Sequence, residues 1–205
     1  NPKVERKVVL FAVIALFLIR FTNQTVRAAI GVEQPWTQAF PFHMCTVLTF
    51  VLPLSIVFDW KAIKTPVFVL SIMGGVITAL LGDYFGDRFL TFFAFEGMTA
   101  HSLLIVVPIF EIAAGRYKLD LRDCWKVFAG ILILMGWAML ANLVFYPSTG
   151  ANYMYLMENA LPFGNERNYF LFYILIFLFF FAVIYAGPIL RTLPLLTNRK
   201  NQVSA

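Results

Sequence analysis

The chain has 205 residues, of which 60% are hydrophobic and only 13% are charged. About a quarter of the residues of a soluble domain are charged, so this composition excludes an ordinary water-soluble globule and indicates a polytopic membrane protein. The formal net charge of +5 could indicate nucleic-acid binding. The distribution of the basic residues instead indicates cytoplasmic loops that face anionic lipid and set the membrane topology, so no nucleic-acid partner is expected.

Six apolar segments have about the 17 to 25 residues that a membrane-spanning helix needs. The expected fold class is therefore an all-α bundle of six transmembrane helices, built as a single domain over residues 1–205. In the third helix, Gly74 and Gly75 indicate a face where a neighbouring helix comes close. The predicted helices cover residues of about 8–30, 39–58, 66–81, 92–112, 125–145 and 169–190.

The basic residues fall mainly on one side of this topology. Of 16 lysines and arginines, twelve lie before the first segment, between the second and third, between the fourth and fifth, or after the sixth. Arg27, Arg88 and Arg167 fall on the other side, and Arg20 lies within a segment. Basic residues concentrate in cytoplasmic loops. The pattern predicts a multi-pass plasma-membrane protein with both termini in the cytoplasm.

The basic start of the chain also resembles the beginning of a signal peptide. Lys3, Arg6 and Lys7 precede the first apolar segment, but no small-residue cleavage site follows. The segment is therefore expected to be retained as the first helix.

Polar residues gather near the outer ends of the predicted helices. At 1.5 Å per residue, Cys45 lies about 9 Å into the second segment and His101 about 13 Å into the fourth, and both segments run inward. Ionisable residues inside a membrane are costly and more often functional than accidental. Four further residues are expected in the same layer, namely Arg20, Asn23, Glu96 and Asn142.

Each of these residues also has a structural explanation when it is taken singly. A buried cysteine packs as a small hydrophobic residue, and a lone histidine in a helix is usually a satisfied structural group. Asn23 and Asn142 would then hydrogen-bond neighbouring helices. Because independent structural choices have no reason to gather at one depth, the layer favours a catalytic role for Cys45 and His101.

A cysteine and a histidine together suit nucleophilic acyl transfer. The thiolate attacks an ester, and the histidine acts first as base and then as acid. A third group would orient the imidazole, and Asn142, Asn152 and Glu96 remain alternatives for this role. The sequence does not choose between them.

A metal site is less favoured. On a helix His43 cannot share the direction of Cys45, because two residues turn about 200°. A zinc site made from Cys45, His101 and Glu96 is an alternative, but the expected chemistry needs no metal or other cofactor.

Three segments resemble motifs of the YwaF-like family of bacterial integral membrane proteins. Residues 40–45 (FPFHMC) are similar to its LPLHLC signature, with Phe, Phe and Met in place of the three leucines. Residues 99–108 (TAHSLLIVVP) are similar to its histidine helix, and residues 150–156 (GANYMYL) to its GxNYxxL element. The resemblance covers roughly residues 35–190.

This resemblance implies a reaction class. The family is thought to be related to vertebrate membrane acyltransferases that remodel ether phospholipids, and more distantly to androgen-induced hydrolases of fatty-acid esters. In those relatives a Cys or Thr nucleophile and a His carry the chemistry, and the motif match assigns these roles to Cys45 and His101. The GxNYxxL match makes Asn152 and Tyr153 candidates near the site, in an outer connection that is expected to fold back as a lid.

The leading hypothesis is a membrane-embedded acyltransferase or lipid-ester hydrolase that acts on phospholipid acyl esters near the outer leaflet. Arg20 or Arg27 would hold a phosphate, and Asn23 and His43 are further candidates for orienting groups or for substrate contacts. The alternative is a non-enzymatic small transporter or accessory subunit in which the polar layer lines a cavity. The sequence shows no internal repeat of the kind common in transporters, and this favours the enzyme.

Overall fold

The computed structural model describes residues 1–29, 40–81, 91–161 and 163–203. These residues form six α-helices and two short 3-10 helices, with no β-strand among them, so the predicted all-α class is confirmed. The predicted helix ends at 30 and 39, together with Arg88, lie outside the described residues. The helices are α1 (Pro2–Ala29), α3 (Met44–Val57), α4 (Lys61–Leu81), α5 (Phe92–Ala113), α6 (Cys124–Thr149) and α7 (Tyr169–Val203), and the 3-10 helices are η1 (Leu121–Asp123) and η2 (Tyr153–Tyr155).

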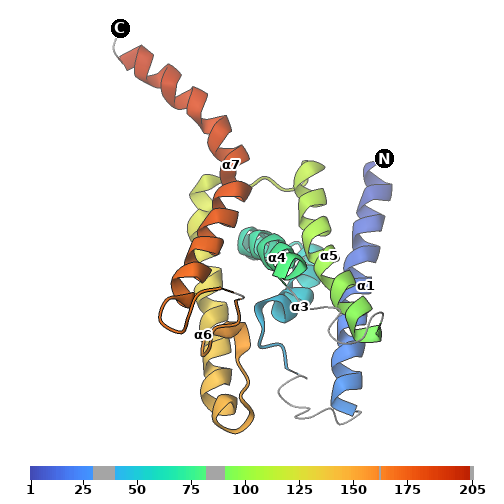
Figure 1. Cartoon of the computed structure of the whole chain (residues 1–205). Coiled ribbons are helices and arrows are strands. Elements are labelled where there is room, and N and C mark those ends of the chain that lie inside the picture. Colours follow the sequence, from blue (N-terminus) through green and yellow to red (C-terminus); the bar gives the residue numbers. More distant parts are fainter. Residues whose placement is uncertain (30–39, 82–90, 162, 204–205) are drawn as a thin grey trace.

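Helix α4 forms the centre of the molecule. In Figure 1 it is seen nearly along its axis, while α1, α5, α6 and α7 run up and down the view around it. It contacts α3, α5 and α6, and it contributes the fully buried Phe68, Leu70 and Met73 to the core. Helix α7 contacts the aromatic ring of Phe128 on α6 through Phe177 and Phe181. Much of the rest of α7 exposes apolar side chains.

Glycines allow α4 to approach its neighbours closely. A Cβ atom added at Gly74 would lie 2.9 Å from the Cys45 sulfur, and one at Gly75 would lie 2.6 Å from Cγ1 of Ile105. On the α6 side, a Cβ added at Gly130 would lie 2.8 Å from Cβ of Pro66. Real Cβ atoms essentially never come this close to another heavy atom. The close helix approach predicted at Gly74 and Gly75 is therefore confirmed.

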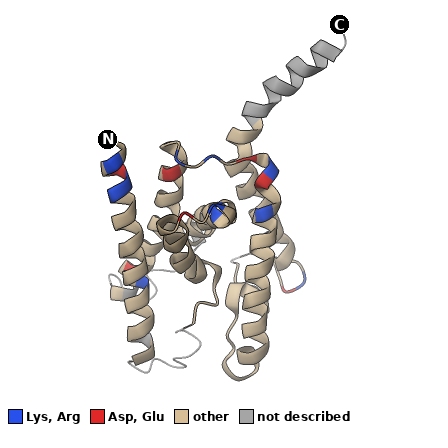
Figure 2. Cartoon of the chain, turned by 180° about the vertical axis from the view of Figure 1, so that it is seen from behind, with Lys and Arg blue, Asp and Glu red and all other residues tan. Residues whose placement is uncertain are grey.

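Charged side chains tie together one end of the bundle. Arg116, which follows α5, pairs with Glu5 of α1 at 3.0 Å and with the buried Glu111 at 2.8 Å. Arg6 donates to the carbonyl oxygen of Ile56 at the end of α3. Figure 2 shows charged residues gathered at the end where the chain begins. The start of α1, the end of α3 and the α5–α6 connection therefore lie together.

Four helices are long and apolar enough to cross a membrane within the described part of the chain, and they are α4, α5, α6 and α7. Helix α3 has only 14 residues, about 21 Å of helix, whereas a hydrocarbon core is about 30 Å thick. Helix α1 carries Arg20 and further polar residues in its second half. The described part of the chain thus has six α-helices, of which four satisfy the length and composition of a span, so the predicted count of six spans is not confirmed.

We predict that Gly75→Ala destabilises the protein by about 1–3 kcal/mol, because the added methyl group would overpack the contact between α4 and α5. The measurement is thermal unfolding of the detergent-purified protein. Gly136→Ala is the matched control, since a Cβ at Gly136 meets no atom within 4 Å. That change should leave stability equal or higher, because alanine favours a helix over glycine by up to about 1 kcal/mol. Equal melting of the two variants would contradict close packing at Gly75.

Candidate functional site

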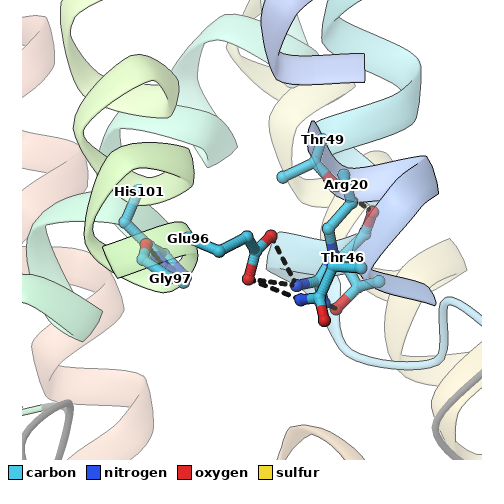
Figure 3. A network of polar contacts seen from close by, with 7 residues as sticks. Arg20, Thr46, Thr49, Glu96, Gly97 and His101 are labelled. Carbon is cyan, nitrogen blue, oxygen red and sulfur yellow. Dashed lines mark hydrogen bonds and ion pairs between the residues drawn. The ribbon is translucent and has the colours of Figure 1, made fainter. Parts of the chain in front are cut away.

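A buried ion pair joins three helices at the opposite end of α1. Nη1 of Arg20 on α1 lies 3.1 and 3.2 Å from the two carboxylate oxygens of Glu96 on α5. Nη2 of Arg20 donates to Oγ1 of Thr46 on α3 at 2.8 Å, and Asn23 donates to Glu96 at 2.6 Å. Figure 3 shows Glu96 reaching across from α5 toward Arg20. The depth argument from sequence thus brought together Arg20, Asn23 and Glu96, which are in contact.

This network has consequences for two predicted roles. Both terminal nitrogens of Arg20 are engaged by Glu96 and Thr46, and Glu96 neutralises the guanidinium. Such a pair is a poor phosphate site, because no unneutralised charge remains to attract the anion. The side chain of Arg27, the other phosphate candidate, lies outside the described residues.

Cys45 lies in the first turn of α3, directly before the Thr46 that Arg20 holds. The Cys45 sulfur lies 3.7 Å from Oγ1 of Thr78 on α4, and Thr78 donates its own hydroxyl proton to the carbonyl oxygen of Gly74 at 2.8 Å. The thiol is therefore the donor to Thr78. An α-helix N-terminus stabilises a thiolate, so α3 presents Cys45 in a position suited to a nucleophile.

His101 is oriented by its own helix. Its Nδ1 lies 2.7 Å from the carbonyl oxygen of Gly97. A carbonyl accepts only, so Nδ1 carries the proton and the lone pair belongs to Nε2, which is the arrangement of a general base. Figure 3 shows the His101 ring lying back along α5 beside Gly97, on another side of the helix from the Glu96 contact with Arg20. The orienting group in the structure is thus a backbone carbonyl.

Cys45 and His101 belong to helices that meet α4 at neighbouring glycines. A Cβ added at Gly74 would lie 2.9 Å from the Cys45 sulfur, and one added at Gly75 would lie 3.0 Å from the backbone oxygen of His101. The Cys45 sulfur lies within hydrogen-bond distance of Thr78. The structure therefore brings the thiol of Cys45 and the backbone of His101 against adjacent positions of α4.

Asn142 hydrogen-bonds the connection between α6 and α7. It is fully buried on α6, its Nδ2 donates to the carbonyl oxygen of Tyr153, and its Oδ1 accepts from the Tyr153 amide at 2.8 Å. Asn152 likewise bonds backbone groups of Met157 and Glu158. Both asparagines thus shape the connection that contains η2.

His43 links this connection to the start of α3. Its Nδ1 accepts from the Met154 amide at 3.3 Å, and its ring packs edge-on against Tyr153. Met154 and Tyr155 both have φ above +50°, a region that non-glycine residues rarely occupy and that stores strain near functional sites. Burial, with a smaller contribution from the nearby Cys45, raises the pKa of Tyr155. The connection therefore lies close to Cys45.

Several contact residues of the site carry no signal in the sequence. Three such residues of apolar helices are Thr46, Thr78 and Gly97. Each becomes part of the site only because the fold brings a hydrogen-bonding partner to it. As for metals, no three His, Cys, Asp or Glu residues come together as possible ligands in the ranges the structure describes. Glu96, a member of the zinc alternative, has both carboxylate oxygens bonded to Arg20 and Asn23.

We predict that Arg20→Met lowers the free energy of unfolding by about 3–5 kcal/mol, because it leaves the buried Glu96 charge without its partner. The double variant Arg20→Met/Glu96→Leu should lose less than the sum of the two single variants. Lys126→Met is the control, since its pair with Asp123 is partly exposed and should contribute at most about 1 kcal/mol. Additive losses in the double variant would contradict a coupled pair.

Comparison with known proteins gives a family for the chain. Neither a search of curated proteins nor a search of solved structures found a significant match. A family model matches residues 1–185, a range that includes every residue of the candidate site. With its apolar helices, the chain is a multi-pass membrane protein. It belongs to the TMEM164 family.

Proposed function

We propose that the chain is a membrane-embedded lipid acyltransferase or lipid-ester hydrolase, with Cys45 as the nucleophile and His101 as the acid and base. One observation carries the proposal: the thiol of Cys45, in the first turn of α3, and the backbone of His101 meet α4 at the neighbouring Gly74 and Gly75, and the His101 ring is oriented by the Gly97 carbonyl. The resemblance of three segments to the YwaF-like family, and through it to ether-phospholipid acyltransferases, supports the same reaction class.

The proposed reaction has two halves. The Cys45 thiol gives its proton to Nε2 of His101, and the sulfur forms a bond to the carbonyl carbon of an acyl ester. The ester C–O bond breaks, and the leaving oxygen takes the proton back from His101. A lyso-lipid hydroxyl, or water, then gives its proton to His101 and attacks the thioester. The C–S bond breaks, and His101 returns the proton to the sulfur to restore the Cys45 thiol.

Entry into this reaction needs one rearrangement. In the structure the thiol donates to Thr78, so in the proposed reaction Cys45 must give up this contact and meet the imidazole of His101. Loss of the hydrogen bond to Thr78 costs about 0.5–1.5 kcal/mol net. The contact with Thr78 therefore describes a resting state that substrate binding would displace.

The proposal includes an orientation. Six spans would place both termini in the cytoplasm and Cys45 and His101 toward the outer leaflet of the plasma membrane. The contacts of Glu5, Arg6 and Arg116 at one end of the bundle support this sidedness, because they join segments that the basic-residue pattern assigns to the cytoplasm. The Arg20–Glu96 pair supports burial of the second half of α1, because its charges are satisfied inside the protein.

We predict that Cys45 forms a thioester with a phospholipid acyl chain. Intact-mass spectrometry of the purified protein, incubated with a phospholipid and quenched in acid, should show one added acyl group that neutral hydroxylamine removes. Cys45→Ala should abolish the adduct and His101→Ala should reduce its rate by about 10²–10⁴-fold, the usual contribution of acid–base catalysis.

The control is Cys124→Ala, which removes the other cysteine and should leave the adduct unchanged. An adduct that persists in Cys45→Ala, or no adduct on the wild-type protein with any phospholipid class, would reject the enzyme. The second outcome would favour the transporter or accessory subunit, in which the polar residues line a cavity.

A further inference from the structure

Gln24 has a buried amide oxygen without a hydrogen-bond partner among the described residues. The residue is only 7% exposed, and the atom without a partner is Oε1. A buried polar group left unpaired costs roughly 1–3 kcal/mol, so each such group needs an explanation. Packing alone does not explain Gln24, since a leucine would fill a similar volume without this cost.

A second unsatisfied atom lies one turn away. Nε of Arg20 is also buried and has no partner in the described ranges, although both terminal nitrogens of the same side chain are bonded. Residues four apart share one face of a helix, with about 5–6 Å between their Cβ atoms. This face of α1 therefore carries one unused donor and one unused acceptor, close to each other and out of water.

The location of the two atoms connects them to the proposed reaction. The same Arg20 that carries the unused donor holds Thr46, and Thr46 directly follows Cys45. An alcohol is the group that such a pair suits, because a hydroxyl donates one hydrogen bond and accepts others. Its O–H would donate to Oε1 of Gln24, and its oxygen would accept from Nε–H of Arg20.

We propose that Gln24 and Arg20 form a binding site for the free hydroxyl of a lysophospholipid, the acyl acceptor. This inference rests on the proposed function, and it assigns to α1 the recognition of the acceptor. The site distinguishes a lysolipid from a fully acylated lipid, which has no hydroxyl at that carbon. An ester oxygen accepts hydrogen bonds but donates none, so a bound diacyl lipid would leave Oε1 of Gln24 without a donor.

The experiment measures binding without turnover. Wild-type protein in detergent, given no acyl donor, is titrated with 1-acyl lysophosphatidylcholine and separately with its 2-deoxy analogue, and native mass spectrometry reports each bound fraction. We expect the wild type to bind the hydroxyl-bearing lipid about 3- to 10-fold more tightly, which is the range that one net hydrogen bond gives. Gln24→Leu should bring this ratio close to one.

Thr25→Val is the matched control. Thr25 is the next residue on α1, it is exposed, and its hydroxyl bonds only to its own helix at Phe21, so the ratio should stay as in the wild type. A wild-type ratio of one, or an unchanged ratio in Gln24→Leu, would overturn the inference and assign the two atoms to a bound water. These binding measurements do not depend on the reaction at Cys45. If Cys45 forms a thioester but the protein does not prefer the hydroxyl-bearing lipid, only the Gln24–Arg20 site is refuted. If the protein prefers the hydroxyl-bearing lipid but forms no thioester, only the proposed enzymatic activity is refuted.

Discussion

The constraint that governs one end of this protein is the cost of a charge away from water. Arg20 and Glu96 are both largely buried, and each would be strongly unfavourable alone. Pairing them requires α1 and α5 to lie side by side, and the second nitrogen of Arg20 brings in α3 through Thr46. One ion pair therefore fixes the relative positions of the helices that carry Cys45 and His101.

Close backbone contact supplies the complementary constraint. Apolar side chains give little preference among helix arrangements inside a lipid environment, so small residues decide where helices meet. Gly74 and Gly75 let α3 and α5 reach α4, since a side chain at Gly74 would collide with the Cys45 sulfur and one at Gly75 would collide with Ile105 and the backbone of His101. The ion pair aligns the two outer helices, and the glycines set their distance from the central one.

Helix positions that depend on hydrophobicity could be predicted from the sequence, whereas helix ends that depend on local backbone conformation could not. The helices α5 and α6 begin within one residue of the predicted starts, because long apolar runs define them. α3 begins at Met44 rather than near residue 39, since Pro41 disfavours a helical conformation for the preceding residue and His43 is extended. α4 begins five residues earlier than predicted, because its first turns contain Lys64 and Thr65, which hydropathy excludes and which Asp59 and Tyr117 satisfy.

The candidate site likewise contains contacts that could be predicted from helix geometry and contacts that could not. Depth along the predicted helices brought Arg20, Asn23 and Glu96 together, because depth follows from helix geometry alone. The partner of Asn142 could not be predicted in this way, since it is a backbone segment whose shape depends on Met154 and Tyr155 in the left-handed region. Thr78 could be found only from the fold, because a threonine in an apolar helix usually bonds its own backbone.

The contact between Cys45 and Thr78 gives the site a chemical logic that the residue types alone do not suggest. A thiol that already faced an imidazole, near a helix start and beside Arg20, would be prone to ionise and react with any electrophile that reached it. In the proposed enzyme, a thiol that is hydrogen-bonded to Thr78 does not give its proton to His101, so the reaction starts only when a substrate displaces that contact. In a bilayer, where acyl esters surround the protein at high concentration, control of access to the nucleophile matters as much as its strength. In the proposed enzyme, the left-handed residues of η2 beside His43 and the Cys45–Thr78 contact would serve one requirement, namely that the reactive geometry forms only around a bound lipid.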